Sequence, residues 1–229
     1  MDPLMTGPTH CFTPDLLQGK RALVTGGGTG IGRAIAIALA QAGADLILAA
    51  RQLPALQATA KEIETETGRN VLVTQVDIRS LESVQTLAEF VTENGAQVDI
   101  LVNNAGILSN NKILETTPEE WKKVMSVNLD GAFYLSQQLI PYMKSRGWGR
   151  IINTCSLASK TGGITAGTAY TTSKGALTSL TFSLARELAG EGITVNGISP
   201  AYVKTPMITE QLNEEQRQVL LEQIPVGRF

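Results

Sequence analysis

Short apolar runs alternate along the chain with longer stretches in which apolar residues recur at helical spacing. The apolar runs, which predict buried strands, cover residues 22–25, 45–50, 71–76, 100–103, 151–154 and 194–198. The helical stretches between them cover residues 33–42, 56–67, 80–94, 121–142 and 171–188. This alternation predicts a single α/β domain, a Rossmann-like, doubly wound parallel sheet with helices on both faces. Ligands of such sheets bind outside the carboxyl ends of the strands.

A glycine-rich segment lies between the first predicted strand and the first predicted helix. It reads Thr25-Gly-Gly-Gly-Thr-Gly-Ile-Gly32. A strand, a glycine turn and a helix N-terminus bring backbone N–H groups together in a geometry that receives a diphosphate. We expect Gly26, Gly30 and Gly32 to provide a tight turn, close approach of a cofactor and close helix–strand packing. Glycine turns are common and this spacing differs from the usual dinucleotide fingerprint, so the segment alone is weak evidence.

A tyrosine and a lysine stand one helical turn apart in the last predicted helix. The segment reads Tyr170-Thr-Thr-Ser-Lys174, so both side chains leave the same helix face. A free phenol titrates near pH ~10. We expect the neighbouring ammonium to favour the phenolate and to lower the tyrosine pKa toward neutrality, where a general acid or base works best. The pair alone is more typical of a solvated helix face, and other motifs are needed to favour the catalytic interpretation.

These segments resemble, in order, the motifs of the short-chain dehydrogenase/reductase family. The matching motifs are Thr25 to Gly32, Asn103-Asn-Ala-Gly106, Ser126-Val-Asn-Leu129, Ser156 after the fifth strand, Tyr170 to Lys174, and Val195-Asn-Gly-Ile-Ser-Pro200. The resemblance runs from about residue 19 to the last residue and is strongest to 3-oxoacyl-thioester reductases. It implies an oxidoreductase that transfers a hydride between a nicotinamide cofactor and a carbonyl or secondary alcohol. We expect residues 19–229 to form this catalytic domain and residues 1–18 to form a flexible arm.

The resemblance assigns four catalytic residues. Ser156 orients the substrate oxygen, and Tyr170 donates or accepts the proton. Lys174 holds the nicotinamide ribose and lowers the pKa of Tyr170. Asn128 holds a water that links the lysine to solvent; the alternative is a helix-interior asparagine that satisfies local backbone. Ser159 is a rival to Ser156, which occupies the family's position.

The resemblance also implies the cofactor-binding residues, which are Gly26, Thr29, Gly30, Ile31, Gly32, Arg51, Asp77, Ile78, Asn104, Ala105, Gly106, Tyr170, Lys174, Pro200, Val203 and Thr205. Arg51 stands where members that prefer NAD place an aspartate. An arginine pairs with a 2′-phosphate, which favours NADP(H) over NAD(H); the alternative is a solvated loop residue. Asp77 is expected at the adenine edge, with a helix N-cap as its alternative, a role for which Ser80 is also placed.

Composition limits the other classes of function. The chain has 229 residues, with 19 Lys plus Arg against 21 Asp plus Glu, so no strong field attracts nucleic acid or an anionic membrane. The only histidine is His10, which excludes a histidine acid–base pair and a multi-histidine zinc site, and we expect no metal. With two cysteines, no transmembrane run and no secretory pattern in residues 1–14, we expect a cytoplasmic protein. Cys155 is expected to pack as a small apolar group, with a nucleophile or redox sensor as its alternatives.

The substrate is expected between the segments 157–168 and 202–212. Apolar residues there suit a 3-oxoacyl or other hydrophobic ketone; they are Ile164, Tyr202, Met207 and Ile208. Polar residues nearby suit a sugar or polyol instead; they are Asn110, Asn111 and Thr165. A third possibility, a protein that senses NADP(H) without turnover, has no need of the serine, tyrosine and lysine.

The chain departs from the family at three places. Family members usually continue beyond the position of Phe229 through another helix and a seventh strand, so we expect this sheet to lack that strand. The family's Pro-Gly after the sixth strand is Pro200-Ala201, and the interval from Ser156 to Tyr170 is one residue longer. We expect a homodimer or homotetramer through the two long predicted helices, whose small and apolar residues include Ala132, Phe133, Leu135, Leu177, Leu180 and Leu184.

Overall fold

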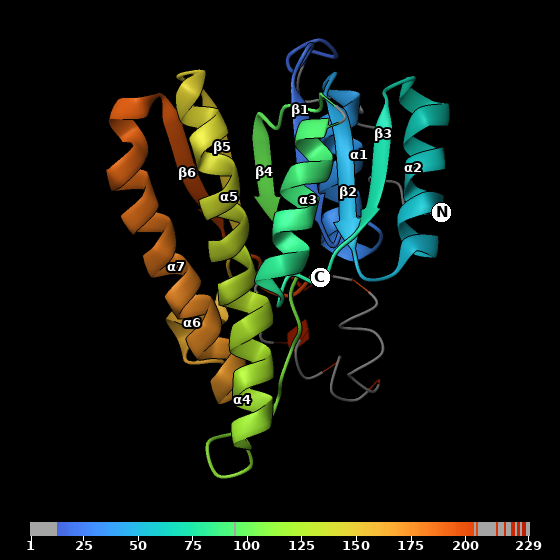
Figure 1. Ribbon diagram of the computed structural model, residues 1–229. Coiled ribbons are helices and arrows are strands. Elements are labelled where there is room, and N and C mark those ends of the chain that lie inside the picture. Colours follow the sequence, from blue (N-terminus) through green and yellow to red (C-terminus); the bar gives the residue numbers. More distant parts are fainter. Residues whose placement is uncertain are drawn as a thin grey trace.

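The computed structural model describes residues 13–93, 95–203, 205, 214, 218, 221–222, 224 and 226–227. In this part of the chain, six parallel strands form one central sheet (Figure 1). They are β1 (Arg21–Thr25), β2 (Asp45–Ala50), β3 (Val71–Gln75), β4 (Ile100–Asn103), β5 (Gly149–Thr154) and β6 (Ile193–Ile198). Their spatial order is β3-β2-β1-β4-β5-β6. The winding reverses between β1 and β4, which confirms the predicted doubly wound sheet and places its ligand crevice at that reversal.

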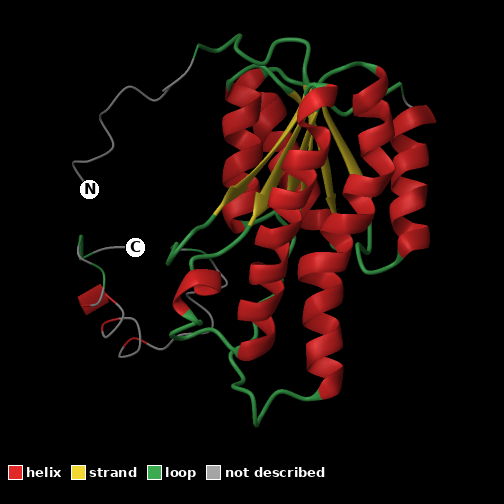
Figure 2. Cartoon of the chain, turned by 90° about the vertical axis from the view of Figure 1, so that its left-hand side faces the viewer, coloured by secondary structure: helices red, strands yellow, loops and turns green. Residues whose placement is uncertain are grey.

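Helices cover both faces of the sheet (Figure 2). The helices α1 (Gly30–Gln41) and α2 (Leu53–Thr67) pack on one face, and α3 (Leu81–Glu93), α5 (Gly131–Ser145) and α7 (Thr168–Leu188) pack on the other. The helices α4 (Pro118–Met125) and α6 (Ala158–Thr161) lie beyond the carboxyl ends of the strands (Figure 1). A short 3₁₀ turn, η2 (Ala189–Glu191), follows α7.

The core lies in two layers because successive residues of a strand point to opposite faces. On β1, Leu23 packs in a buried cluster with residues of α3 and α5. Its neighbours Ala22 and Val24 pack in a second cluster with α1 and α2. Strands buried on both faces read as continuous apolar runs, which is why the sequence predicts them so closely.

The long helix predicted for residues 121–142 is interrupted by a π-helical turn. Between α4 and α5 lies η1 (Ser126–Asp130), and the N–H of Gly131 donates to the carbonyl of Ser126, five residues earlier. Such π-helical turns are rare in proteins, and those that do occur often lie at functional sites. Asn128 lies within this turn and is buried.

Residues 13–18, the described end of the expected arm, form turns rather than an extended chain. The N–H of Leu17 donates to the carbonyl of Ala42, and the Leu17 side chain packs against the α1–α2 cluster. The domain boundary at residue 18 stays a prediction. No helix in the described residues is both long and apolar enough to cross a membrane.

Candidate active site

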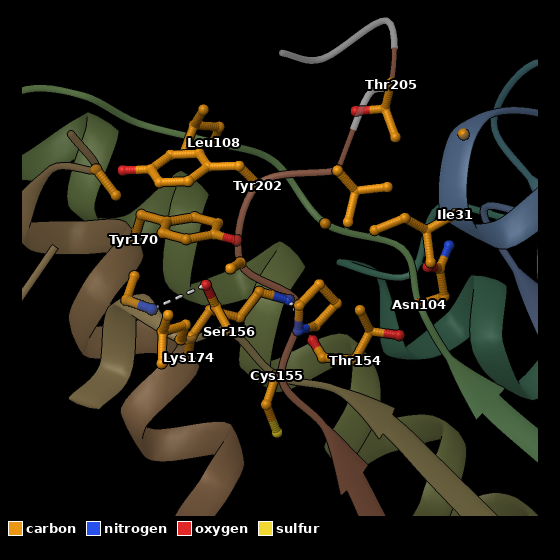
Figure 3. A pocket seen from close by; sticks show the side chains of 18 of the residues that line it. Ile31, Asn104, Leu108, Thr154, Cys155, Ser156, Tyr170, Lys174, Tyr202 and Thr205 are labelled. Carbon is orange, nitrogen blue, oxygen red and sulfur yellow. Dashed lines mark hydrogen bonds between the residues drawn. The ribbon is translucent and has the colours of Figure 1, made fainter. Parts of the chain in front are cut away.

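A pocket opens at the carboxyl ends of β1, β4 and β5, beside the glycine segment. One wall carries Ser156, Tyr170 and Lys174, and the opposite wall carries Ile31 and Asn104 (Figure 3). Most of the predicted cofactor residues line it, namely Gly26, Thr29, Gly30, Ile31, Gly32, Asn104, Ala105, Gly106, Pro200, Val203 and Thr205. The structure therefore brings the glycine segment and the Tyr–Lys pair, far apart in sequence, to one cavity.

The glycine segment has the backbone shape that a phosphate site needs. Gly26 and Gly30 have φ of 67° and 54°, in the left-handed region that other residues rarely adopt. A Cβ on Gly32 would lie 2.3 Å from the carbonyl oxygen of Gly26. Thr29 precedes α1 in extended conformation, and its side chain makes no capping hydrogen bond. The first N–H groups of α1 are left to bind an anion, so the segment fits a dinucleotide.

A hydrogen-bonded brace joins the glycine segment to β4. The Thr25 hydroxyl donates to the carbonyl of Val102 and accepts from the N–H groups of Asn104 and Ala105, each at 3.0 Å. The Asn104 side chain donates back to the Thr25 carbonyl at 2.9 Å. These hydrogen bonds fix the start of the glycine segment to the segment that follows β4. The sequence motif names Thr25, but we did not predict it as a site residue.

Ser156 lies two residues after the end of β5, where it lines the pocket. Its hydroxyl accepts from the N–H of Ala158 at 3.2 Å, which leaves the hydroxyl proton for another partner. The rival Ser159 uses its own hydroxyl to donate to the Ser156 carbonyl at 2.7 Å, and it does not line the pocket. The geometry therefore favours Ser156.

Tyr170 lies in the first turn of α7, and burial raises the pKa of its phenol above the ordinary value of 10.0, while a hydrogen bond with Ser156 opposes the shift. The prediction that Lys174 lowers this pKa is wrong for the free protein. The lysine nitrogen lies 5.9 Å from the centre of the tyrosine ring and donates to the Thr154 carbonyl at 2.7 Å. Because loss of solvent dominates, the phenol is protonated at neutral pH.

Lys174 is only 4% exposed. A lysine side chain in water is positively charged at neutral pH, so its burial is unusual. Burial lowers its pKa from 10.5 to about 8, and a charge interaction with the neighbouring Cys155 opposes this shift. Gly106 lies beside the ammonium, and a Cβ there would be in ordinary contact with the lysine nitrogen, at 3.4 Å. A buried lysine with one carbonyl partner has donors to spare. The hydroxyls of a ribose would use them.

Asn128 connects three separate segments of the chain. Its amide nitrogen donates to the Ile107 carbonyl and to the Ser173 hydroxyl, both at 3.0 Å, and its oxygen accepts from the Ile107 N–H at 2.8 Å. Ser173 in turn donates to the Tyr170 carbonyl. Its partners are distant in sequence, so the alternative of a locally satisfied asparagine is wrong. The proposed water relay through Asn128 stays a prediction.

Three predicted cofactor residues lie outside this pocket. Arg51 is exposed at the end of β2, beside Gln75. Asp77 pairs with Arg79, and mainly that hydrogen bond lowers the Asp77 pKa to about 2. Ile78 is buried against Gly131.

The start of α3, shortly after Asp77, is capped by another side chain, so the Asp77 carboxylate is not used as its cap. The Ser80 hydroxyl accepts from the N–H of Ser83, and the Ser83 hydroxyl accepts from the N–H of Asp77. Ser80 therefore provides the cap on α3, and the cap alternative for Asp77 is wrong. The Asp77 carboxylate is left facing the arginines, where the nearby charge of Arg51 also lowers its pKa.

Thr154 is a pocket residue that the sequence reasoning missed. Its side-chain oxygen is buried without a hydrogen-bond partner among the described residues, and it lines the cavity two positions before Ser156. Buried hydroxyls are normally paired, so an unpaired one in a cavity fits a bound polar group. The sequence alone carries no signal for this role, because the burial of the hydroxyl and its lack of a partner are properties of the tertiary structure.

The substrate end of the pocket is more apolar than polar. Leu108, Ile164 and Tyr202 line it, whereas Asn110 and Asn111 do not. Asn111 instead donates to the carboxylate of Glu120. Met207 and Ile208 lie outside the described residues. No cluster of three potential metal ligands occurs in the part of the chain that the structure describes.

Replacing Lys174 by methionine should change how stability depends on pH. Between the folded pKa of about 8 and the ordinary 10.5, the unfolded chain binds more protons than the folded protein, so this group's contribution to stability rises with pH. We expect the free energy of unfolding of the variant, relative to wild type, to fall by about 3 kcal/mol from pH 7.5 to 10.5. Urea unfolding at each pH measures this.

The exposed Lys122 on α4, changed to methionine, is the control and should show no such trend. A constant difference between Lys174→Met and wild type across this range would contradict the lowered pKa.

Comparison with known proteins agrees with the geometry. The model of the short chain dehydrogenase family matches residues 20–216. The 2-dehydro-3-deoxy-D-gluconate 5-dehydrogenase of Bacillus subtilis is 44% identical over 214 residues, which cover 93% of this chain and 83% of that protein. The 3-oxoacyl-[acyl-carrier-protein] reductase FabG of Aquifex aeolicus is 39% identical over 213 residues, which cover 93% of this chain and 85% of that protein.

A solved structure shows the same fold. L-sorbose reductase from Gluconobacter frateurii, complexed with NADPH and L-sorbose, is 32% identical and superposes with a TM-score of 0.87 over 95% of this chain and 86% of that one. The chain belongs to the short chain dehydrogenase family of oxidoreductases, which act on CH–OH and C=O groups.

Proposed function

We propose that the protein is an NADPH-dependent ketoreductase for a 3-oxoacyl or other hydrophobic ketone. The observation that carries this proposal is the pairing of a protonated, half-buried Tyr170 with Ser156 at an apolar pocket end. Leu108 and Ile164 offer contact to an acyl chain or similar group. FabG of Aquifex aeolicus, named as a reductase of 3-oxoacyl groups, supports the substrate class.

The side chains divide the work of reduction. When bound, the cofactor supplies the hydride. Ser156 donates a hydrogen bond to the carbonyl oxygen, where negative charge develops, and so stabilises the transition state. Tyr170, with its raised pKa, holds its proton at neutral pH and delivers it to that oxygen. Lys174 donates to ribose hydroxyls with the protons that the Thr154 carbonyl does not take.

We propose NADP(H) as the cofactor, with NAD(H) as the second choice. The exposed Arg51 at the end of β2 is placed to pair with a 2′-phosphate, since β2 lies beside β1 and its glycine segment. The L-sorbose reductase was solved with NADPH. The Asp77–Arg79 pair next to Arg51 offers a polar edge for the adenine.

A sugar acid or polyol is the second candidate substrate. The first support is the 44% identity with the gluconate-derivative dehydrogenase of Bacillus subtilis. The second is a pair of hydroxyls at the pocket, Thr165 Oγ1 and Tyr202 Oη, 3.2 Å apart. These could bind substrate hydroxyls. We keep this candidate because neither observation depends on Leu108 or Ile164.

We also propose that the protein forms a homodimer or homotetramer and works in the cytoplasm. Of the residues expected at the helix interface, Ala132, Leu135 and Leu177 are buried within the domain and cannot reach a partner. Phe133 on α5 is 43% exposed, and Phe182 on α7 is 73% exposed. Exposed aromatic residues on two helices support a contact there.

Replacing Tyr170 by phenylalanine should lower the rate of NADPH consumption by about 10²–10⁴-fold, because it removes the proton donor and keeps the ring. The assay uses a panel of β-keto thioesters, hydrophobic ketones and keto-sugars. Wild type should prefer the first two. NADPH affinity, measured by fluorescence, should change little.

Tyr142→Phe is the control, because this tyrosine is exposed on α5 outside the pocket. Retention of most wild-type activity in Tyr170→Phe would refute the catalytic assignment. Preference for keto-sugars would favour the second candidate, and no turnover of any substrate would favour a sensor.

Replacing Arg51 by aspartate should move preference from NADPH toward NADH. A carboxylate repels a 2′-phosphate and accepts hydrogen bonds from a free 2′-hydroxyl. Loss of a charge-assisted bond costs about 1.5–3 kcal/mol, roughly ten- to a hundredfold in NADPH affinity. The exposed Arg186 on α7, changed to aspartate, is the control for charge alone. The cofactor proposal would be overturned if the kcat/KM of the wild-type protein for NADH equalled or exceeded its kcat/KM for NADPH.

Light scattering at micromolar concentration should show a dimer or tetramer. The double variant Phe133→Glu, Phe182→Glu should dissociate it, because the carboxylates would be buried in the interface. A double variant at the exposed Ile113 and Leu114, changed to glutamate, is the control. A wild-type monomer would contradict the proposal.

A further inference from the structure

Two loops lie against each other at the substrate end of the pocket. The first, residues 104–117, joins β4 to α4 and projects with α4 beyond the carboxyl ends of the strands (Figure 1). The second, residues 162–167, joins α6 to α7. The N–H of Gly167 donates to the carbonyl of Ser109 at 2.6 Å, and the N–H of Thr168 donates to the carbonyl of Asn111 at 3.0 Å. A Cβ on Gly167 would lie 2.4 Å from the Asn111 oxygen, so the two backbones are in close contact.

The second loop carries pocket residues but has little backbone bonding of its own. Gly163, Ile164, Thr165 and Ala166 all line the pocket. Among the described residues, none of the backbone–backbone hydrogen bonds outside helices and strands involves these four. Gly162 and Gly163 both have left-handed φ, of 76° and 74°. A glycine-rich segment with so few backbone bonds needs some other group to hold its shape.

The Thr165 side chain contacts Tyr202, and the ammonium of Lys112 holds the backbone of the loop. Its nitrogen donates to the carbonyls of Gly163 at 2.8 Å and Ala166 at 2.7 Å, and it lies 3.4 Å from the carbonyl of Ile164. An ammonium has three donors, and these carbonyls use them. The Lys112 side chain does not line the pocket, so it acts on the loop from behind.

Lys112 itself projects from a fixed turn. Its carbonyl accepts from the N–H groups of Glu115 and Thr116, at 3.0 and 2.9 Å, and from the Thr116 hydroxyl. On the other side, Glu120 accepts from the side chains of Ser109 and Asn111, and these bonds lower the Glu120 pKa. Thr117 caps α4 through the N–H of Glu120. The first loop is therefore fixed to α4. Lys112, which belongs to the first loop, in turn fixes the second loop through its hydrogen bonds to that loop's carbonyls.

We propose that Lys112 is a positioning residue that sets the shape of the substrate end of the pocket and thereby the affinity for the carbonyl substrate. This inference rests on the proposed carbonyl reduction. The ammonium fixes the carbonyls of Gly163 and Ala166, and so fixes Ile164 and Thr165 between them against the substrate. It does not touch the glycine segment or Lys174, so cofactor binding is independent of it.

The test compares Lys112→Met, which keeps the aliphatic stem and removes the charge, with Lys112→Arg and the control Lys122→Met. For Lys112→Met we expect KM for the carbonyl substrate to rise about tenfold, the value for one lost charge-assisted hydrogen bond. We expect kcat to fall by less than about threefold, and the Kd for NADPH and the pH profile of kcat to stay unchanged. Lys112→Arg should restore most of the affinity, and Lys122→Met should match wild type.

Hydrogen exchange provides a second measurement that needs no substrate. Amides of residues 162–168 should exchange faster in Lys112→Met than in wild type, while those of residues 24–32 should not change. An unchanged KM, or equal exchange in the two proteins, would overturn the proposal. So would a parallel loss of NADPH affinity and thermal stability, which would indicate a general structural role. If wild type reduces no carbonyl, the proposed function fails, and the exchange measurement alone decides whether Lys112 holds the loop.

Discussion

The buried ammonium of Lys174 is the constraint on which the rest of the site depends. A charge removed from water is costly unless it finds hydrogen-bond partners, and this one has the Thr154 carbonyl at the end of β5. The cost appears as a pKa lowered to about 8. A cavity that keeps a lysine in this state is ready for a ligand with several hydroxyl oxygens, and the nicotinamide ribose is such a ligand.

Contacts from several segments hold that lysine and its neighbours in place. Gly106 lies directly beside the ammonium. Asn128 in the π-helical turn ties the loop after β4 to Ser173, one residue before the lysine. The Thr25–Asn104 brace fixes the glycine segment at the opposite wall. These contacts all lie where the parallel sheet reverses its winding, so the fold delivers both halves of the site to one edge.

The sequence predicted the sheet and most of the pocket for an understandable reason. Strands buried on both faces read as apolar runs. Gly26 and Gly30 have a left-handed φ that other residues rarely adopt, and position 32 has no room for a Cβ. The π-helical turn at Asn128 was missed because a single extra residue in a helix hardly changes its apolar period. The pKa of Tyr170 was predicted in the wrong direction because burial, which dominates it, is a property of tertiary structure.

Contacts between loops were the part least open to prediction. Lys112 reads in the sequence as one exposed lysine among many, and only the approach of the second loop gives it three carbonyl partners. The hydroxyl of Thr154 likewise becomes informative only once it is seen to be buried without a partner. Arg51, by contrast, was identified by its position after a strand, which needs no side-chain geometry.

Proton uptake on binding of NADP⁺ tests the central claim most directly. Calorimetry at pH 8.5 in buffers of different ionisation enthalpy reports the number of protons bound with the cofactor. Ribose oxygens that accept from Lys174 favour its charged form, so its pKa of about 8 should rise and the complex should take up roughly 0.7 proton. Uptake should be absent at pH 7 and in Lys174→Met. No uptake at pH 8.5 in wild type, or equal uptake in the variant, would contradict the placement of the cofactor on the buried lysine.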